Sequence, residues 1–244
     1  MAKHQLVCLV GLLFLVVRPV WAAPITLGDF SGATVEFTNV VADDGAQIGA
    51  ATLNGDSLEF TPRLSSGSAG GSSGATAATL TFGLAAKSGF AIDAFIAQAN
   101  GIYSLTGLGT GLTNAMEGIF IQLIIDEVDG NPIAPVTQNL SVSASYSLFP
   151  NQDDDQPWSV GVSGNLPGIL NGHSVPFTFG ATHAFITFTD TLSTASEDGS
   201  TATIRKDAFS VGAETIPTTA VPEPSSLCLV GLGVMAAYRR LRRV

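Results

Sequence analysis

The sequence predicts an all-β protein, a single antiparallel β-sandwich of jelly-roll type that lies between two terminal targeting segments. Short runs rich in Thr, Val, Ile and Phe recur along the middle of the chain, and Gly, Asn and Asp turn residues separate them. Several runs alternate between polar and apolar residues, as strands with one wet face do. Many short strands at this spacing are typical of a sandwich.

Ten segments have this strand-like pattern. They are 34–41, 47–53, 57–62, 78–84, 118–125, 139–148, 158–162, 174–178, 183–192 and 202–211. Residues 92–99 are the one segment with a helical pattern, and Asp198-Gly199 predicts a hairpin turn. The Ser/Gly/Ala-rich segment 65–78 predicts a mobile surface loop, and its match to G-x-S-x-G lacks the strand and helix that a hydrolase elbow needs.

The N-terminus has the pattern of a secretory signal peptide, over residues 1–22. An apolar run of 12 residues, 6–17, follows a short polar stretch. Small residues then lead to Ala22, after which we expect signal peptidase to cut, and Ala23 is the next candidate. The run is too short to span a bilayer, which takes about 20 apolar residues.

The C-terminal segment, residues 220–244, has three parts. Pro222, Glu223 and Pro224 form an extended stretch, because each proline disfavours helix. A run of 12 apolar or small residues follows at 227–238, and we expect it to form a short hydrophobic helix of about 18 Å. A basic end closes the chain. It contains Arg239, Arg240, Arg242 and Arg243.

This C-terminal segment resembles the PEP-CTERM sorting signal of Gram-negative bacteria, in which a Val-Pro-Glu-Pro-Ser stretch precedes a Leu/Gly-rich helix and a basic end. The one departure is Cys228, where Trp or Ala is commoner. The resemblance implies recognition by an exosortase, a membrane protease-transpeptidase, at or near residues 222–224. It also implies transient inner-membrane anchoring, and then delivery to the cell surface or the extracellular matrix. The arginines should stay cytoplasmic.

The charge and cysteine content of the predicted mature domain, residues 23–219, exclude several classes of function. The sequence between the two targeting segments contains four cationic residues and nearly all of the 20 acidic ones. Such a surface repels nucleic acid. Both cysteines, Cys8 and Cys228, lie in the targeting segments, so the domain has no disulfide framework or thiolate metal site.

Acidic loops are the candidate ligand sites. Carboxylates on loops suit calcium, which takes six to eight oxygen ligands. The best candidates are Asp126, Asp129, Asp153, Asp154 and Asp155. The alternative is that these are solvated turns, because Asp, Asn and Gly favour turns. No EF-hand spacing is present, and His173 and His183 are not spaced as zinc ligands.

No catalytic residue constellation is visible, so the sequence favours a non-enzymatic surface or matrix protein that associates with a polymer or carbohydrate. Two alternatives stay open. One is a secreted hydrolase that cleaves polysaccharide with a carboxylate pair. The other is a calcium-stabilised adhesin. The expected partners are signal peptidase, an exosortase and an extracellular polysaccharide, and no cofactor other than calcium is expected.

Overall fold

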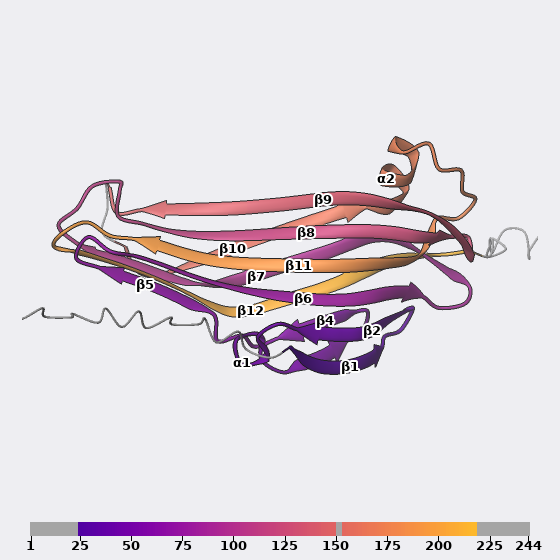
Figure 1. Cartoon of the computed structure of the whole chain (residues 1–244), viewed down its shortest axis with the longest axis horizontal. Helices are drawn as coiled ribbons and strands as arrows, with labels where there is room; N and C mark the ends of the chain where they lie inside the picture. The colour runs from indigo at the N-terminus through magenta and orange to yellow at the C-terminus, as the bar shows by residue number, and fades with distance from the viewer. Residues whose placement is uncertain (1–23, 150–152, 219–244) are drawn as a thin grey trace, which may run out of the picture.

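The computed structural model describes residues 24–149 and 153–218, which are built almost entirely of strands (Figure 1). The predicted leader 1–22 and C-terminal segment 220–244, including the helix at 227–238, lie outside the described residues. The elements are β1 (Ile25–Ser31), β2 (Val35–Ala42), α1 (Gly45–Ile48), β3 (Ala51–Asn54), β4 (Ser57–Phe60), β5 (Ser65–Ala69), β6 (Ser73–Ala86), β7 (Phe90–Gly107), β8 (Asn114–Val128), β9 (Asn131–Ser147), β10 (Asp153–Asn165), α2 (Leu166–Gly172), β11 (Ala181–Ala195) and β12 (Ser200–Pro217).

The strands pair antiparallel in two layers. One layer has the order β1-β2-β6-β11-β8-β9. In the other, β7 pairs with β10 and β12, and β12 also pairs with β4 and β5. A bridge between Ala181 and Ile92 connects the layers at one end. Figure 1 shows the first layer in front, with β9, β8, β11 and β6 side by side. The predicted antiparallel β-sandwich is confirmed.

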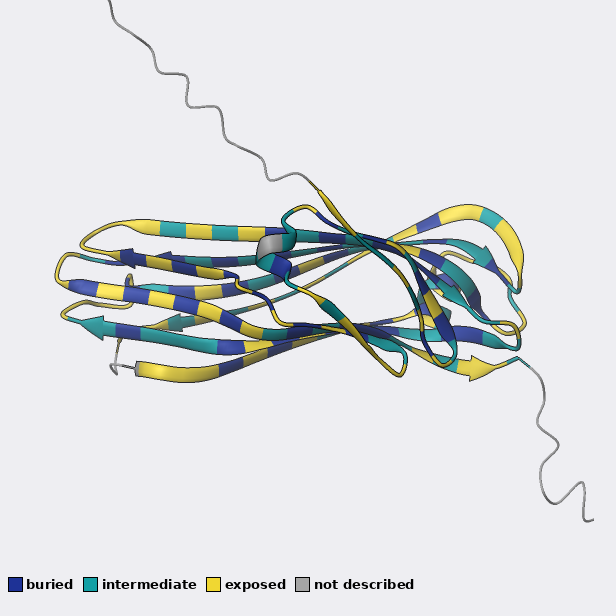
Figure 2. Ribbon diagram, turned by 90° about the horizontal axis from the view of Figure 1, so that it is seen from below, coloured by how far each residue is buried: buried dark blue, intermediate teal, exposed yellow. Residues whose placement is uncertain are grey.

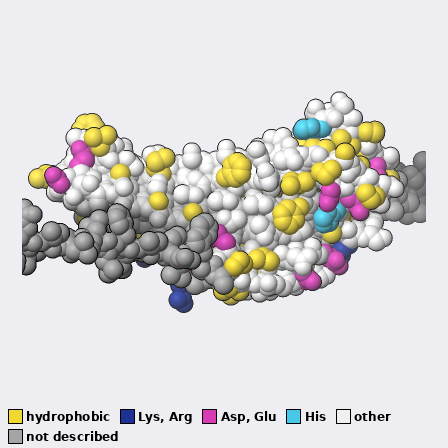
Figure 3. Space-filling model, in the orientation of Figure 1, with side chains coloured by type: hydrophobic (Ala, Val, Ile, Leu, Met, Phe, Trp, Pro, Cys, Tyr) yellow, Lys and Arg dark blue, Asp and Glu magenta, His cyan; other side chains and the backbone are white. Residues whose placement is uncertain are grey.

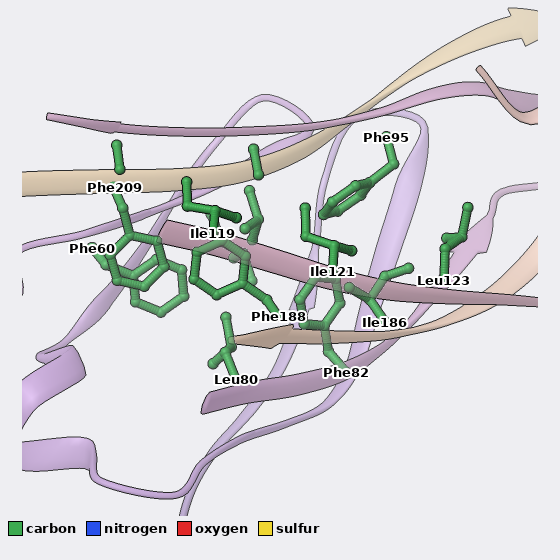
Figure 4. Packing of buried hydrophobic residues seen from close by; sticks show 14 of the residues in the cluster. Phe60, Leu80, Phe82, Phe95, Ile119, Ile121, Leu123, Ile186, Phe188 and Phe209 are labelled. Carbon is green, nitrogen blue, oxygen red and sulfur yellow. The ribbon is translucent and has the colours of Figure 1, made fainter. Parts of the chain in front are cut away.

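The core lies between the layers because each long strand turns every second residue inward. Alternating buried and exposed bands follow the strands in Figure 2. Aromatic and branched side chains fill the interior (Figure 4). Phe209 stacks between Phe60 and Phe188, with ring centroids 4.3 and 5.4 Å apart. These three rings come from β4, β11 and β12, so they join the two layers.

The Ser/Gly-rich segment 65–78 is not the long surface loop that its composition predicts. It forms β5, a tight turn and the first residues of β6. Gly70 and Gly71 make the turn with φ values of 59° and 78°, which side chains with a Cβ rarely adopt. Small residues suit the packing here, because a Cβ on Gly74 would lie 2.6 Å from the carbonyl oxygen of Gly67. The composition therefore reflects close strand packing.

Three further predictions are wrong. Residues 92–99 form part of the 18-residue strand β7 and not a helix. Residues 174–178 lie in an irregular segment after α2 and not in a strand. The Asp198-Gly199 turn exists, but the strands on either side of it belong to opposite layers, so it is not a hairpin. In the part of the chain that the structure describes, no helix has the length and apolarity to cross a bilayer.

Candidate functional site

The predicted calcium ligands Asp126 and Asp129 lie at the end of β8 and in the turn that follows, and both have protein partners. Oδ1 of Asp126 lies 2.5 Å from Nδ1 of His183. The Asp129 carboxylate accepts hydrogen bonds from three successive backbone N–H groups, those of Thr178 (2.6 Å), Phe179 (2.9 Å) and Gly180 (3.0 Å). Burial opposes ionisation of Asp129, but these bonds outweigh it and lower its pKa. Asp129 therefore fixes the segment before β11.

The other predicted ligands, Asp153, Asp154 and Asp155, begin β10 at the opposite end of the sandwich. The backbone N–H of Asp155 donates to Ser104 Oγ at 2.9 Å, and that hydroxyl lies 3.2 Å from the Asp155 carboxylate. The side chain of Asp154 is exposed. Strands of 15 and 17 residues separate this end from the β8–β9 turn, a length of about 45 Å. The two acidic groups therefore cannot share one ion.

Across residues 24–149 and 153–218, no three His, Cys, Asp or Glu side chains are grouped as metal ligands would be. Each of the two ends must therefore be considered separately. Calcium binding there stays a prediction.

The outward side of β6, β11, β8 and β9 forms a continuous surface, which we call the outer face. Its residues are Ser73, Ala75, Ala77, Thr79, Thr81 and Gly83 on β6, Phe185, Thr187, Thr189, Thr191, Ser193 and Ala195 on β11, Asn114, Met116, Gly118, Phe120, Gln122 and Ile124 on β8, and Thr137, Asn139, Ser141, Ser143, Ser145 and Ser147 on β9. None of these residues is charged, although the chain is strongly acidic. The middle of this side is mostly white in Figure 3, with a few hydrophobic side chains.

The strand register arranges the outer face as a grid. One row across the four strands is Thr79, Thr189, Phe120 and Ser141, and the next is Ala77, Thr191, Gly118 and Ser143. Neighbouring strands lie about 4.8 Å apart, and outward residues along one strand about 6.8 Å apart. The six rows therefore cover about 34 Å by 14 Å. Hydroxyl groups occupy much of this area.

A shallow hollow of about 330 Å³ lies in the middle of the outer face. Gly118, Phe120, Ser141, Ser143 and Thr191 line it. The hollow exists because Gly118 has no side chain, and a Cβ added there would meet no atom within 4 Å. Phe120 borders it and is 44% exposed. An exposed ring beside hydroxyl groups and an open glycine is a surface that a flat, uncharged ring can contact.

A second group of residues, within the core, combines three buried charged side chains, and we call it the buried triad. Lys206 Nζ lies 2.9 Å from Glu117 Oε1 and also contacts Asp190 Oδ2. The lysine and glutamate side chains are 0% exposed and that of the aspartate is 4% exposed. The rings of Trp158 and Phe209 lie within 6 Å of Nζ, at 5.6 and 5.8 Å.

The buried triad has one positive group for two acidic groups. Burial raises the pKa of Glu117 to about 8, since the favourable charge of Lys206 is partly offset by the carboxylate of Asp190. Burial also raises the pKa of Asp190. At neutral pH one of the two acids is therefore protonated, and the cluster is close to neutral.

Sequence reasoning missed the outer face and the buried triad. The outer face depends on register between strands that are far apart in the sequence. The buried triad had a local signal, because Lys206 follows Ala202 and Ile204 on the apolar side of an alternating strand. Glu117 and Asp190 interrupt apolar series in the same way, on β8 and β11.

Comparison with solved structures finds a weak likeness to a phage protein. The chain is similar to the enzymatically active domain of bacteriophage CBA120 tailspike protein 4, with 13% identity and a TM-score of 0.20. The similarity covers 79% of this chain and 20% of the tailspike chain. This chain thus spans about a fifth of that protein's length, and a TM-score this low carries no inference about activity. No curated protein matches the chain.

The predicted sorting residues Ala22, Pro222, Glu223, Pro224, Arg239, Arg240, Arg242 and Arg243 all lie outside the described residues. Comparison with protein families nevertheless identifies the C-terminal segment. The model of the PEP-CTERM protein-sorting motif matches residues 220–243, where the extended Pro-Glu-Pro stretch, the apolar run and the basic end occur together. The chain therefore carries a PEP-CTERM sorting motif, which marks it as an exported, cell-surface-directed substrate of an exosortase-type membrane enzyme.

Proposed function

We propose that the exported domain is a non-enzymatic binding module of the cell surface or extracellular matrix, and that its outer face binds a neutral polysaccharide. The observation that carries the proposal is the uncharged grid of hydroxyl-bearing residues around Phe120. Sugars present hydroxyl groups at their ring edges and apolar C–H groups on their ring faces. The outer face offers matching groups for both, through its Ser and Thr residues and its exposed ring.

The size and shape of the outer face suit a chain of sugars better than a single one. The hollow at Gly118 would hold one sugar ring against Phe120, with Thr191 on one side and Ser143 on the other. Rows of hydroxyl groups continue along the strands in both directions, so further rings of an extended chain would also find partners. Each such contact is weak, and binding along a polymer adds them.

Charge supports a neutral polysaccharide as the ligand. The chain has a formal net charge of -10, and this acidic surface repels anionic polymers. A neutral chain lying on the uncharged face avoids that repulsion. Binding should therefore depend weakly on ionic strength.

The burial of the acids in the triad supports a non-enzymatic role. Hydrolysis of a glycosidic bond takes two carboxyl groups that flank the substrate. Glu117 and Asp190 are the pair that contact one lysine, and both lie in the core, where a polysaccharide cannot reach them.

Binding at the hollow can be tested in a pull-down assay with an insoluble neutral polysaccharide, such as cellulose or chitin. Phe120→Ala should weaken binding roughly tenfold, because covering a Phe side chain contributes about 1.5 kcal/mol. Gly118→Val should weaken binding as strongly, because it puts a side chain into the hollow at a position where an added Cβ meets no atom within 4 Å.

Phe179→Ala is the matched control, because Phe179 is 41% exposed but lies away from the outer face. It should bind as the wild type does. Equal binding by all four proteins, or no binding to any neutral polysaccharide, would contradict the proposal.

A further inference from the structure

The buried triad brings together side chains from both layers of the sandwich. Lys206 lies on β12 in one layer, while Glu117 and Asp190 lie on β8 and β11 in the other. The register pairs Glu117 with Leu192, so the two acids are diagonal neighbours on one inner face. Lys206 therefore reaches across the core to both.

The buried triad is not a fully paired salt bridge. Buried ion pairs are stable when every charge and lone pair has a partner. Here, Glu117 Oε2 and Asp190 Oδ1 are buried and have no hydrogen-bond partner. One lysine also cannot balance two carboxylates, so one of the two acids must keep its proton in the core.

We propose that Lys206 and Asp190 form an intramolecular amide bond, with loss of one water, and that Glu117 transfers the protons. The product has no charge on either linked side chain. It also removes one oxygen atom of Asp190. The bond would remove the buried charges of the three side chains and part of the unsatisfied polarity that they bring into the core.

The proton balance of the reaction is complete without a cofactor or oxidant. In the reacting form of the cluster the single acid proton lies on Asp190, Glu117 is ionised and Lys206 carries three protons on Nζ. Glu117 takes one proton from Nζ, which frees the amine to attack Cγ of Asp190. The N–C bond forms, and a second amine proton passes through Glu117 to the departing hydroxyl group. The C–O bond breaks, water leaves and Glu117 ends as a neutral acid.

The surroundings favour each step. A site with low polarity disfavours the ionised form of an acid, which favours the neutral Asp190 that the reaction needs. Burial raises the pKa of both acids in this structure. Direct contact between Nζ and the Asp190 carboxylate places the reactants together, as intramolecular reactions require. The rings of Trp158 and Phe209 lie close to Nζ and limit the access of water, which would reverse the reaction.

The backbone also directs Lys206 toward the acids. The pairing of β12 with β7 shifts register between Lys206 and Ala208, so a bulge at Asp207 follows the lysine directly. Bulges re-aim side chains and are common beside functional sites. Arg205 and Asp207, on either side, form an exposed ion pair at 3.2 Å, which leaves Lys206 as the inward residue.

Peptide mapping of the purified full chain tests the bond without reference to terminal processing. Cleavage after glutamate cuts at Glu127, Glu197 and Glu214, which puts Asp190 and Lys206 on separate peptides, 128–197 and 198–214. When wild-type protein that has folded is digested, we expect these two peptides to stay covalently joined under denaturing conditions. Their joint mass should be one water below the sum of the two peptides.

Four variants identify the groups. Asp190→Asn should yield the same joined product as the wild type, because an asparagine amide would lose ammonia where the acid loses water. Asp190→Ala and Lys206→Arg should yield separate peptides. Glu117→Gln, which keeps the shape of the side chain, should yield mostly separate peptides because the proton acceptor is gone.

The wild-type measurement decides the proposal even where a variant fails to fold. If folded wild-type protein gives separate peptides with unchanged masses, no amide forms and the proposal is wrong. If Glu117→Gln gives the joined product as completely as the wild type, the bond stands but the role of Glu117 is wrong.

Discussion

Replacing Phe209 by alanine should lower the free energy of unfolding by about 3–5 kcal/mol, which is the usual cost of removing a buried aromatic ring. The cost should lie at the upper end because Phe209 stacks on Phe60 and on Phe188 at once, and is 4% exposed. Its loss leaves a cavity where β4, β11 and β12 meet. For a domain of this size the melting temperature should fall by roughly 10 °C.

Urea denaturation followed by circular dichroism measures this effect, with Phe149→Ala as the matched control. Phe149 is 68% exposed, so its removal should change the unfolding free energy by less than about 0.5 kcal/mol. A loss below 1 kcal/mol for Phe209→Ala would show that the stack does not join the layers as described.

The stability of the domain should decrease as the pH rises from about 4.5 to about 8. Glu117 has a folded-state pKa of about 8 and an ordinary value of 4.5 in the unfolded chain. Between these values the unfolded chain releases a proton that the folded domain keeps, so higher pH favours unfolding. The full difference corresponds to roughly 5 kcal/mol. The direction is the same whether or not Lys206 is joined to Asp190, because Glu117 is buried in both states.

Other carboxylates make the domain less stable at acidic pH. Hydrogen bonds hold the pKa of Asp129 and of Glu197 below their ordinary values. Their contribution is present above about pH 4.5 and is lost as the pH falls through their folded pKa values. Maximal stability should therefore lie near pH 5, which is lower than for a domain without Glu117.

The pH dependence is measured by urea denaturation at pH 5, 6, 7 and 8. Glu117→Gln should flatten the profile over this range, because glutamine does not titrate. Glu36→Gln is the control, since Glu36 is exposed and its removal should leave the wild-type slope. A wild-type profile that is flat or rises over this interval would contradict the raised pKa of Glu117.

Much of the fold could be predicted because strands with one solvent-exposed face have a local signature, the alternation of polar and apolar residues. Strand β9 is the clearest example, since serine occupies every second position of its last third. Strand β7 could not be predicted in full because Asn100 and Gly101, ordinary turn residues, lie in its middle. Gly101 is needed there for packing, since a Cβ would lie 2.8 Å from the ring of Trp158.

The candidate sites could be predicted only in part, because they depend on contacts between distant strands. The register that places Thr189 beside Phe120 is fixed by pairing across about 70 residues of sequence, and no local pattern specifies it. The acidic loops had a strong local pattern, but Asp129 uses its carboxylate to hold the backbone of another loop. Turn chemistry and metal ligation use the same residue types, and sequence alone does not separate them.

The central claim is that this is an exported chain whose two ends are targeting segments. The mass and the location of the protein purified from its own host test it. We expect a product at the cell surface or in the extracellular matrix, which begins at residue 23 and ends near residues 222–224. Recovery of the full 244-residue chain from the cytosol, with Met1 and the four C-terminal arginines present, would contradict it.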